Sequence, residues 1–119
     1  MWAFLRFART SLSFLLGVGM GMGVCMGKSK VLENKPVAYL TCNGSPPSEG
    51  KPSLMTFSEV TTLFHETGHG LQHMLTTVSE GAVSGISGVE WDAVEQPSQF
   101  MEYWVLEEGT LSSMAKHWR

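Results

Sequence analysis

Two histidines with a glutamate beside the first stand in the run His65-Glu66-Thr67-Gly68-His69, an HExxH pattern. Residues four apart lie on one face of a helix, so both imidazoles can reach a single cation. Imidazole is a common ligand of Zn²⁺, and a catalytic zinc site needs a third protein ligand and one open position. Glu66 is placed to take a proton from water activated by such a metal. The pattern predicts one hydrolytic zinc centre per chain, although these five residues also fit two solvent-facing histidines on an ordinary helix.

Spacing does not fix the third ligand of this centre. His73 lies one turn further along the same helix face, too far along a straight helix to complete a tetrahedral site. We therefore expect His73 to pack inside the fold or to support the site from behind, with packing favoured. A carboxylate from a second helix is the other route. The candidates are Glu80, Glu90, Asp92 and Glu95, and carboxylate chemistry does not choose among them.

The HExxH residues fall within a predicted helix that begins at Thr56. Thr56 followed three residues later by Glu59 is a capping box. Apolar residues then recur at helical spacing to about Thr76, and they are Val60, Leu63, Phe64, Leu71 and Leu75. Gly68 and Gly70 each weaken a helix by about 1 kcal/mol relative to alanine. We therefore expect another backbone or a substrate to approach this helix closely.

A second helix is predicted from Asp92, because Glu95 three residues later forms a second capping box. Its apolar face continues to Val105, and Pro97 is expected to distort its second turn. Residues 36–42 predict a short strand, and 53–55 a brief strand edge, with a proline-rich loop over 45–52 between them. Three glycines predict an irregular loop between the helices, namely Gly81, Gly85 and Gly88.

Composition bounds the class of protein. The chain has 119 residues, enough for one small domain, and its net charge of −3 argues against a nucleic-acid partner held by a basic surface. Its two cysteines, Cys25 and Cys42, are too few for a disulfide framework. Five cations and one acid stand up to Lys35, whereas nine acids and two cations stand from Phe57 onward. This asymmetry predicts an N-terminal segment over 1–34 and a folded part over 35–119.

The N-terminal segment is glycine-rich and apolar, with no charge over 12–27. Its length fits the core of a secretory leader, and its arginines and serines fit a transit peptide. Glycines spaced four apart, such as Gly17 and Gly21, fit a membrane anchor through residues 1–30. A low-complexity segment without defined structure is the remaining interpretation. The sequence does not choose among these four.

Several blocks of residues together carry a family resemblance. The blocks are 64–66, 68–70, 73–76, 83–85, 88–95 and 97–102, with 36–43 and 51–55 upstream. Over residues 35–106 the chain resembles the active-site core of the thimet oligopeptidase family of zinc metallopeptidases, the M3 peptidases. It is most similar to the oligopeptidase A branch and its organellar relatives. So long a composite pattern is far more specific than HExxH alone.

The resemblance implies that His65, His69 and Glu95 bind zinc and that Glu66 is the general base. Asp92 then becomes a candidate to hydrogen-bond a ligand imidazole, with helix capping as its other role. The implied fold is mainly α, part of a zincin helical core with one or two short strands before the active-site helix. The implied activity is zinc-dependent endopeptidase hydrolysis of internal bonds in short peptides. The implied compartment is the cytosol or an organelle.

Departures from the family keep other hypotheses open. Thr67 stands where the family usually has phenylalanine, which loosens the apolar packing behind the zinc. Members of the family are several times longer and carry substrate-binding His and Tyr residues further C-terminal. The alternatives are a zinc-binding fragment without activity and a small membrane-tethered interaction protein. In each case we expect self-association or pairing with further helices, because many apolar side chains lack neighbours.

Overall fold

The computed structural model describes residues 3–4, 21–26, 35–41, 50 and 53–116. Within them the chain is mainly helical, which confirms the predicted class. The elements are β1 (Ala3–Phe4), β2 (Gly21–Met26), β3 (Val37–Thr41), α1 (Phe57–Met74), the 3₁₀ turn η1 (Gly81–Val83), α2 (Gln96–Leu106), α3 (Glu108–Met114) and β4 (Ala115–Lys116).

Helix α1 begins as the sequence predicts. The Thr56 hydroxyl accepts a hydrogen bond from the Glu59 backbone N–H at 3.2 Å, and the Glu59 carboxylate accepts one from the Thr56 backbone N–H. This reciprocal pair satisfies two of the N–H groups that a helix start leaves without partners. The helix ends at Met74, with Leu75 as its C-cap, close to the predicted end at Thr76.

Helix α2 begins later than the sequence predicts. It starts at Gln96, and Glu95 is its N-cap residue without a side-chain capping bond. The predicted capping box at Asp92 is therefore wrong, because residues 91–95 form turns instead. Pro97 falls in the first turn, where its missing N–H is not needed, so the predicted distortion of a second turn is also wrong. Proline thus favours this helix start, since its fixed φ suits the first turn.

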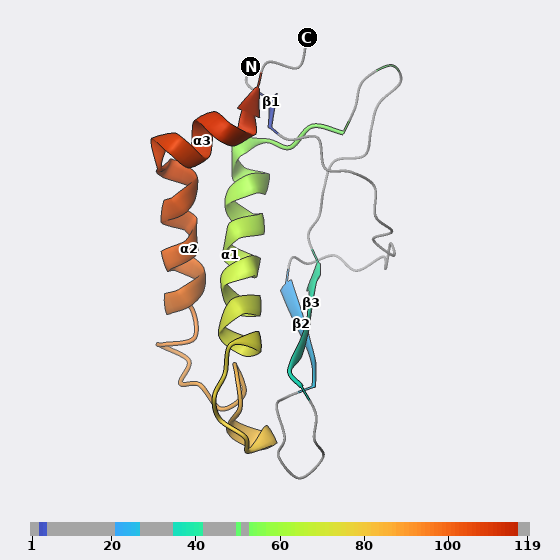
Figure 1. The fold of residues 1–119 in the computed structure, drawn as a ribbon, viewed down its shortest axis with the longest axis vertical. Coiled ribbons are helices and arrows are strands. Elements are labelled where there is room, and N and C mark those ends of the chain that lie inside the picture. Colours follow the sequence, from blue (N-terminus) through green and yellow to red (C-terminus); the bar gives the residue numbers. More distant parts are fainter. Residues whose placement is uncertain (1–2, 5–20, 27–34, 42–49, 51–52, 117–119) are drawn as a thin grey trace.

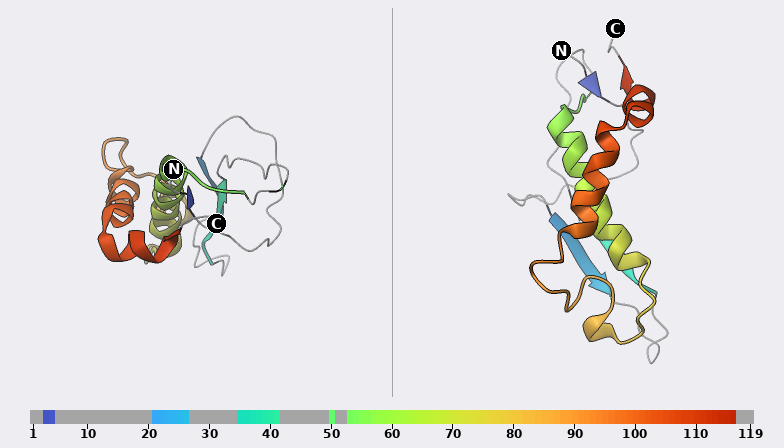
Figure 2. Two further views of the ribbon diagram at one scale, coloured as in Figure 1. Left: turned by 90° about the horizontal axis from the view of Figure 1, so that it is seen from above. Right: turned by 90° about the vertical axis from the view of Figure 1, so that its left-hand side faces the viewer.

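The two long helices run antiparallel, side by side, as Figure 1 shows. Strands β2 and β3 form an antiparallel pair on the other side of α1, so α1 lies between α2 and the strands (Figure 1; Figure 2, left). Glycine allows close contact on both sides. A Cβ at Gly70 would lie 3.1 Å from the Leu40 side chain of β3, and one at Gly68 would lie 2.6 Å from the Ser98 Cα of α2. The predicted close approach to this helix is confirmed.

The short strands include one that the sequence predicts and others that it does not. Strand β3 confirms the predicted strand over 36–42, and Met55 makes a single β-bridge within the predicted edge 53–55. Strand β2 lies within the segment 1–34 that the charge pattern sets apart. Its register pairs Gly21 with Thr41 and Gly23 with Tyr39, with an irregularity between Val24 and Met26. Strand β1 pairs with β4 beyond α3, a helix that sequence reasoning did not predict.

The described core is small. Val60 of α1 and Val105 of α2 are fully buried, and five partly buried apolar side chains pack around them, namely Met55, Phe64, Leu111, Met114 and Ala115. Several large apolar side chains remain exposed as predicted, including Trp91 at 91% and Phe100 at 59%. Within the described residues, no helix is both long and apolar enough to cross a bilayer. Most of the predicted N-terminal segment lies outside the described residues.

Candidate metal centre

Three of the predicted side chains meet between α1 and the start of α2. His65 and His69 project from α1, and Glu95 precedes the first turn of α2. The Oε2 atom of Glu95 lies 3.1 Å from Nε2 of His65 and 3.1 Å from Nε2 of His69. The imidazole rings meet edge to face, with centroids 4.9 Å apart. One donor atom from each of the three residues lies within 4.8 Å of the others.

This donor set fits a zinc ion. Two imidazole nitrogens and one carboxylate oxygen are the His₂Glu set of many catalytic zinc sites. Bonds of about 2.0–2.1 Å in tetrahedral geometry place neighbouring donors about 3.3 Å apart. The two 3.1 Å separations in this structure are close to that spacing. The residues present therefore fit the metal.

Glu95 is held in place by its surroundings on α2. The Ser98 hydroxyl lies 2.8 Å from both the Glu95 carboxylate Oε2 and the Glu95 backbone carbonyl, and Ser98 is fully buried. This hydroxyl, together with nearby His69 and His65, holds the pKa of the Glu95 carboxyl below its usual value. Glu95 is therefore a charged carboxylate at neutral pH, which is the form that binds metal.

Gly68 lets α2 come near enough for Glu95 to reach the imidazoles. A Cβ at this position would lie 2.6 Å from Ser98 Cα and 2.7 Å from the Pro97 carbonyl oxygen. Both neighbours are backbone atoms at the start of α2, next to Glu95. Any side chain in place of Gly68 would have to displace the segment that carries the third donor.

Glu66 is nearly fully buried, at 5% exposure, and its Oε2 atom has no hydrogen-bond partner among the described residues. A buried carboxylate oxygen without a partner is costly, and a catalytic role or a bound ion is one explanation for such a group in a native fold. Two further buried atoms on α1 share this property within the described part of the chain, namely His69 Nδ1 and Gln72 Oε1. Thr67, by contrast, donates its hydroxyl to the Leu63 carbonyl at 2.7 Å, so it is satisfied within its own helix.

Glu102 is a site residue that sequence reasoning missed. Its Oε1 lies 2.6 Å from Nδ1 of His65, the ring nitrogen that faces away from Glu95. Glu102 stands seven residues after Glu95, which places both on one face of α2. That spacing was the signal in the sequence that would have found it.

The other predicted candidates lie elsewhere. Asp92 is exposed in the turn before α2, and within the described residues it forms no hydrogen bond or ion pair with an imidazole. His73 is fully buried, and its Nδ1 accepts a hydrogen bond from the Ile86 backbone N–H at 3.3 Å. Gly85 packs directly on its ring with φ of +67°, so His73 ties the loop after α1 to the helix. Glu80 and Glu90 are exposed on that loop.

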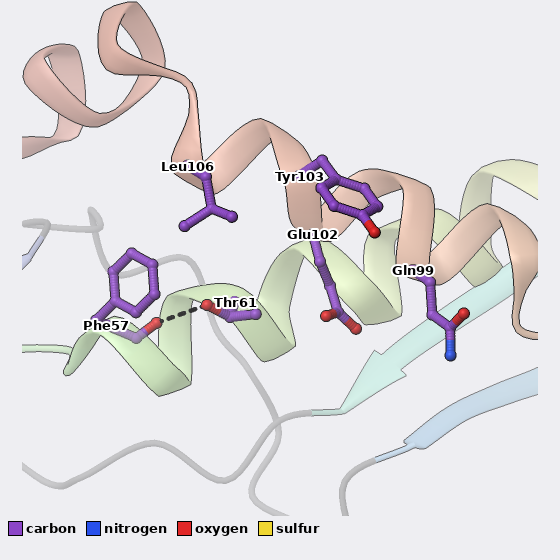
Figure 3. Close-up of a pocket in the computed structure, with 6 residues that line it drawn as sticks. All are labelled: Phe57, Thr61, Gln99, Glu102, Tyr103 and Leu106. Atoms are coloured by element: carbon purple, nitrogen blue, oxygen red, sulfur yellow. Dashed lines mark hydrogen bonds between the residues drawn. The ribbon is translucent and has the colours of Figure 1, made fainter.

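A groove of about 320 Å³ lies between α1 and α2, on the side of Glu102 toward the start of α1. Figure 3 shows the Glu102 side chain directed from α2 toward α1 within it. The groove is lined by Phe57, Thr61, Gln99, Glu102, Tyr103 and Leu106. The groove and the metal centre thus share the interface of the same two helices.

Comparison with known proteins shows the family to which the chain belongs. The model of peptidase family M3 matches residues 18–119. The chain belongs to peptidase family M3. The match takes in β2 as well as the HExxH helix, and it extends beyond the resemblance over 35–106 on both sides.

Similar proteins include oligopeptidases from plants and bacteria. The chain is 54% identical over 106 residues to "Organellar oligopeptidase A, chloroplastic/mitochondrial" of Arabidopsis thaliana, covering 84% of this chain and 13% of that protein. It is 53% identical over 107 residues to "Probable cytosolic oligopeptidase A" of the same plant, covering 85% and 15%. It is 54% identical over 103 residues to oligopeptidase A of Escherichia coli strain K12, covering 84% and 15%. The chain thus spans 13–15% of the length of these relatives.

Proposed function

We propose that this chain carries the zinc site of a metalloendopeptidase that hydrolyses internal bonds of short peptides. The observation that supports the proposal most directly is the convergence of donor atoms from His65, His69 and Glu95 within 4.8 Å. Membership of peptidase family M3 adds the reaction class. The relatives named oligopeptidase A suggest short peptides as substrates.

Each residue of the site has a distinct role in this proposal. His65 and His69 would hold zinc through Nε2, and Glu95 would hold it through Oε2 while offsetting part of its charge. Zinc, when bound, acts as a Lewis acid and lowers the pKa of water to about 7. Glu66 would take a proton from the attacking water at its unpartnered Oε2 and deliver it to the leaving amine.

A cleavage assay tests the catalytic part of the proposal. The zinc-loaded chain is incubated with a quenched fluorescent peptide of about ten residues, and mass spectrometry locates the cut. We expect internal cleavage by the native chain and none by Glu66→Gln, which still binds zinc. Glu108→Gln, an exposed change on α3, is the matched control and should cleave normally. Cleavage by Glu66→Gln at the native rate would contradict the role of Glu66.

Zinc binding without turnover is the second candidate function. It requires only the three donor side chains His65, His69 and Glu95, all of which lie within this chain, and the chain spans 13–15% of the length of each relative. The same assay separates the two candidates. Stoichiometric zinc with no cleavage by the native chain would support a zinc-binding unit that needs further structure for catalysis.

We also propose that the protein is located in the cytosol or in an organelle, because the relatives include organellar and cytosolic proteins by name.

A further inference from the structure

We propose that Glu102 is a positioning residue for His65, holding its imidazole by the Nδ1 proton so that Nε2 presents a lone pair to the metal. This inference rests on the zinc site proposed above. It gives a role to a side chain two helical turns away from the third ligand. Glu102 itself touches neither the metal position nor the peptide in this account.

The contact that carries the proposal is short and partly buried. Oε1 of Glu102 lies 2.6 Å from Nδ1 of His65, slightly closer than the distance of about 2.7–2.9 Å that is typical of a charge-assisted N–H···O hydrogen bond. The Nε2 atom of the same ring lies 3.1 Å from Glu95. The two nitrogens of one imidazole therefore face two carboxylates, both from the α2 side of the site.

The chemistry of a neutral imidazole indicates which of the two nitrogens of His65 carries the proton. A neutral ring has one N–H donor and one acceptor nitrogen, so it can donate to only one of the two carboxylates. The shorter contact places the proton on Nδ1 toward Glu102. Nε2 then has a lone pair facing the Glu95 oxygen, and a metal ion between these two acceptors would satisfy both of them.

The second imidazole of the site lacks such support. His69 Nδ1 is buried and has no hydrogen-bond partner among the described residues. Glu102 therefore acts on one ligand only, and its effect can be separated from that of the rest of the site. Because Glu95 and Glu102 share α2, a single helix sets both the third donor and the orientation of the first.

A purely structural role for Glu102 makes a different prediction. An ion pair that is about one-third exposed contributes little to folding stability, and its loss would lower stability without a specific loss of zinc affinity. A positioning role instead predicts a loss of zinc affinity larger than any loss of stability. Partners that orient metal-bound histidines typically change affinity by about 10–100-fold when removed.

Zinc affinity of the full chain separates these roles. Competition with a chromophoric chelator is measured for the native chain, Glu102→Ala, Glu102→Gln and the control Asp92→Asn. We expect Glu102→Ala to bind about 10–100-fold more weakly. Glu102→Gln keeps an acceptor oxygen for the Nδ1 proton and should recover part of that loss. Asp92→Asn should bind like the native chain, since Asp92 is exposed outside the site. Native affinity in Glu102→Ala would overturn the proposal, as would an equal loss in Asp92→Asn.

A metal-free measurement keeps the test decisive. Nitrogen-15 NMR of the metal-free chain at about pH 8, where an ordinary imidazole is neutral, reports which nitrogen of His65 carries the proton. We expect a proton on Nδ1 in the native chain and a shift of that proton toward Nε2 in Glu102→Ala. A native His65 without a proton on Nδ1 would overturn the inference about Glu102. Failure of the native chain to bind zinc, with Nδ1 protonated, would overturn only the proposed zinc function.

Discussion

Replacing Gly68 by alanine should damage the metal centre while leaving α1 intact. The added Cβ would lie 2.6 Å from Ser98 Cα, 2.7 Å from the Pro97 carbonyl oxygen and 3.0 Å from its carbon. All three neighbours are backbone atoms, so no flexible side chain can move out of the way. The start of α2 must retreat from α1, and Glu95 moves with it.

The size of the effect follows from two distances. Carbon atoms pack at about 3.5–4.0 Å, so the 2.6 Å contact requires a retreat of about 1 Å. Metal–ligand bonds tolerate only about 0.2 Å. The third donor is therefore lost, and we expect zinc affinity to fall by more than about tenfold, the lower bound for loss of an outer partner. Overpacking costs about 1–3 kcal/mol of folding stability, against about 1 kcal/mol gained from the better helix former.

Gly70→Ala is the matched control. It lies two residues along the same helix and has the same gain in helix propensity, but its Cβ would meet only the Leu40 side chain at 3.1 Å. That side chain can shift by a few tenths of an ångström. Isothermal titration with zinc, with circular dichroism as a check on helix content, should show a large loss for Gly68→Ala and little change for Gly70→Ala. Equal zinc affinity in the two variants would refute the reasoning.

Three further predictions concern the supporting structure. Removing the Ser98 hydroxyl in Ser98→Ala should raise the pKa of Glu95 toward its ordinary 4.5. A lowered carboxyl pKa stabilises the fold above about pH 4.5, and this stabilisation is lost as the pH falls through the pKa of Glu95 in the folded chain. The difference in free energy of unfolding between the native chain and Ser98→Ala, measured in urea, should therefore shrink as the pH falls through that pKa. A difference that does not change with pH would contradict this role of Ser98. Thr56→Ala should cost about 1 kcal/mol of stability through loss of the N-cap without altering zinc affinity, and altered affinity would contradict this. Exposed aromatic residues such as Trp91 and Tyr103 predict self-association in sedimentation velocity, and a monodisperse metal-free monomer that unfolds cooperatively would contradict it.

Local signals made much of α1 predictable. The Thr56–Glu59 capping box and the apolar spacing depend only on neighbours within a few residues, so the sequence specifies the helix and its HExxH face. The two glycines in that helix also carried information, because only a close backbone approach explains Gly68.

The start of α2 shows where local signals fail. Asp92 and Glu95 have the spacing of a capping box, but Pro97 is best placed in a first turn and moves the helix start to Gln96. Glu95 thereby becomes an N-cap residue, with its carboxylate turned to the imidazoles instead of to its own backbone. Two local preferences conflict at this point, and the helix start follows the one set by the proline.

Local sequence signals could not identify Glu102 as the partner of His65. Glu102 is 37 residues from His65 in sequence, and only the antiparallel packing of α1 and α2 brings them together. The choice of Glu95 among four candidate carboxylates likewise came from the family resemblance, because the chemistry of a carboxylate is the same at each position. The structure adds the physical reason, since Glu95 alone among those four lies within reach of both imidazoles.

Zinc content measured on the native chain beside Glu95→Gln tests the central claim most directly. Both proteins are dialysed against limiting zinc, analysed by inductively coupled plasma mass spectrometry and titrated with a competing chelator. The three-residue site predicts one zinc per native chain and much weaker binding by Glu95→Gln, because an amide oxygen is neutral and a poorer zinc ligand. Equal zinc content and affinity in the two proteins would contradict the assignment of Glu95. No zinc in the native chain would contradict the centre itself.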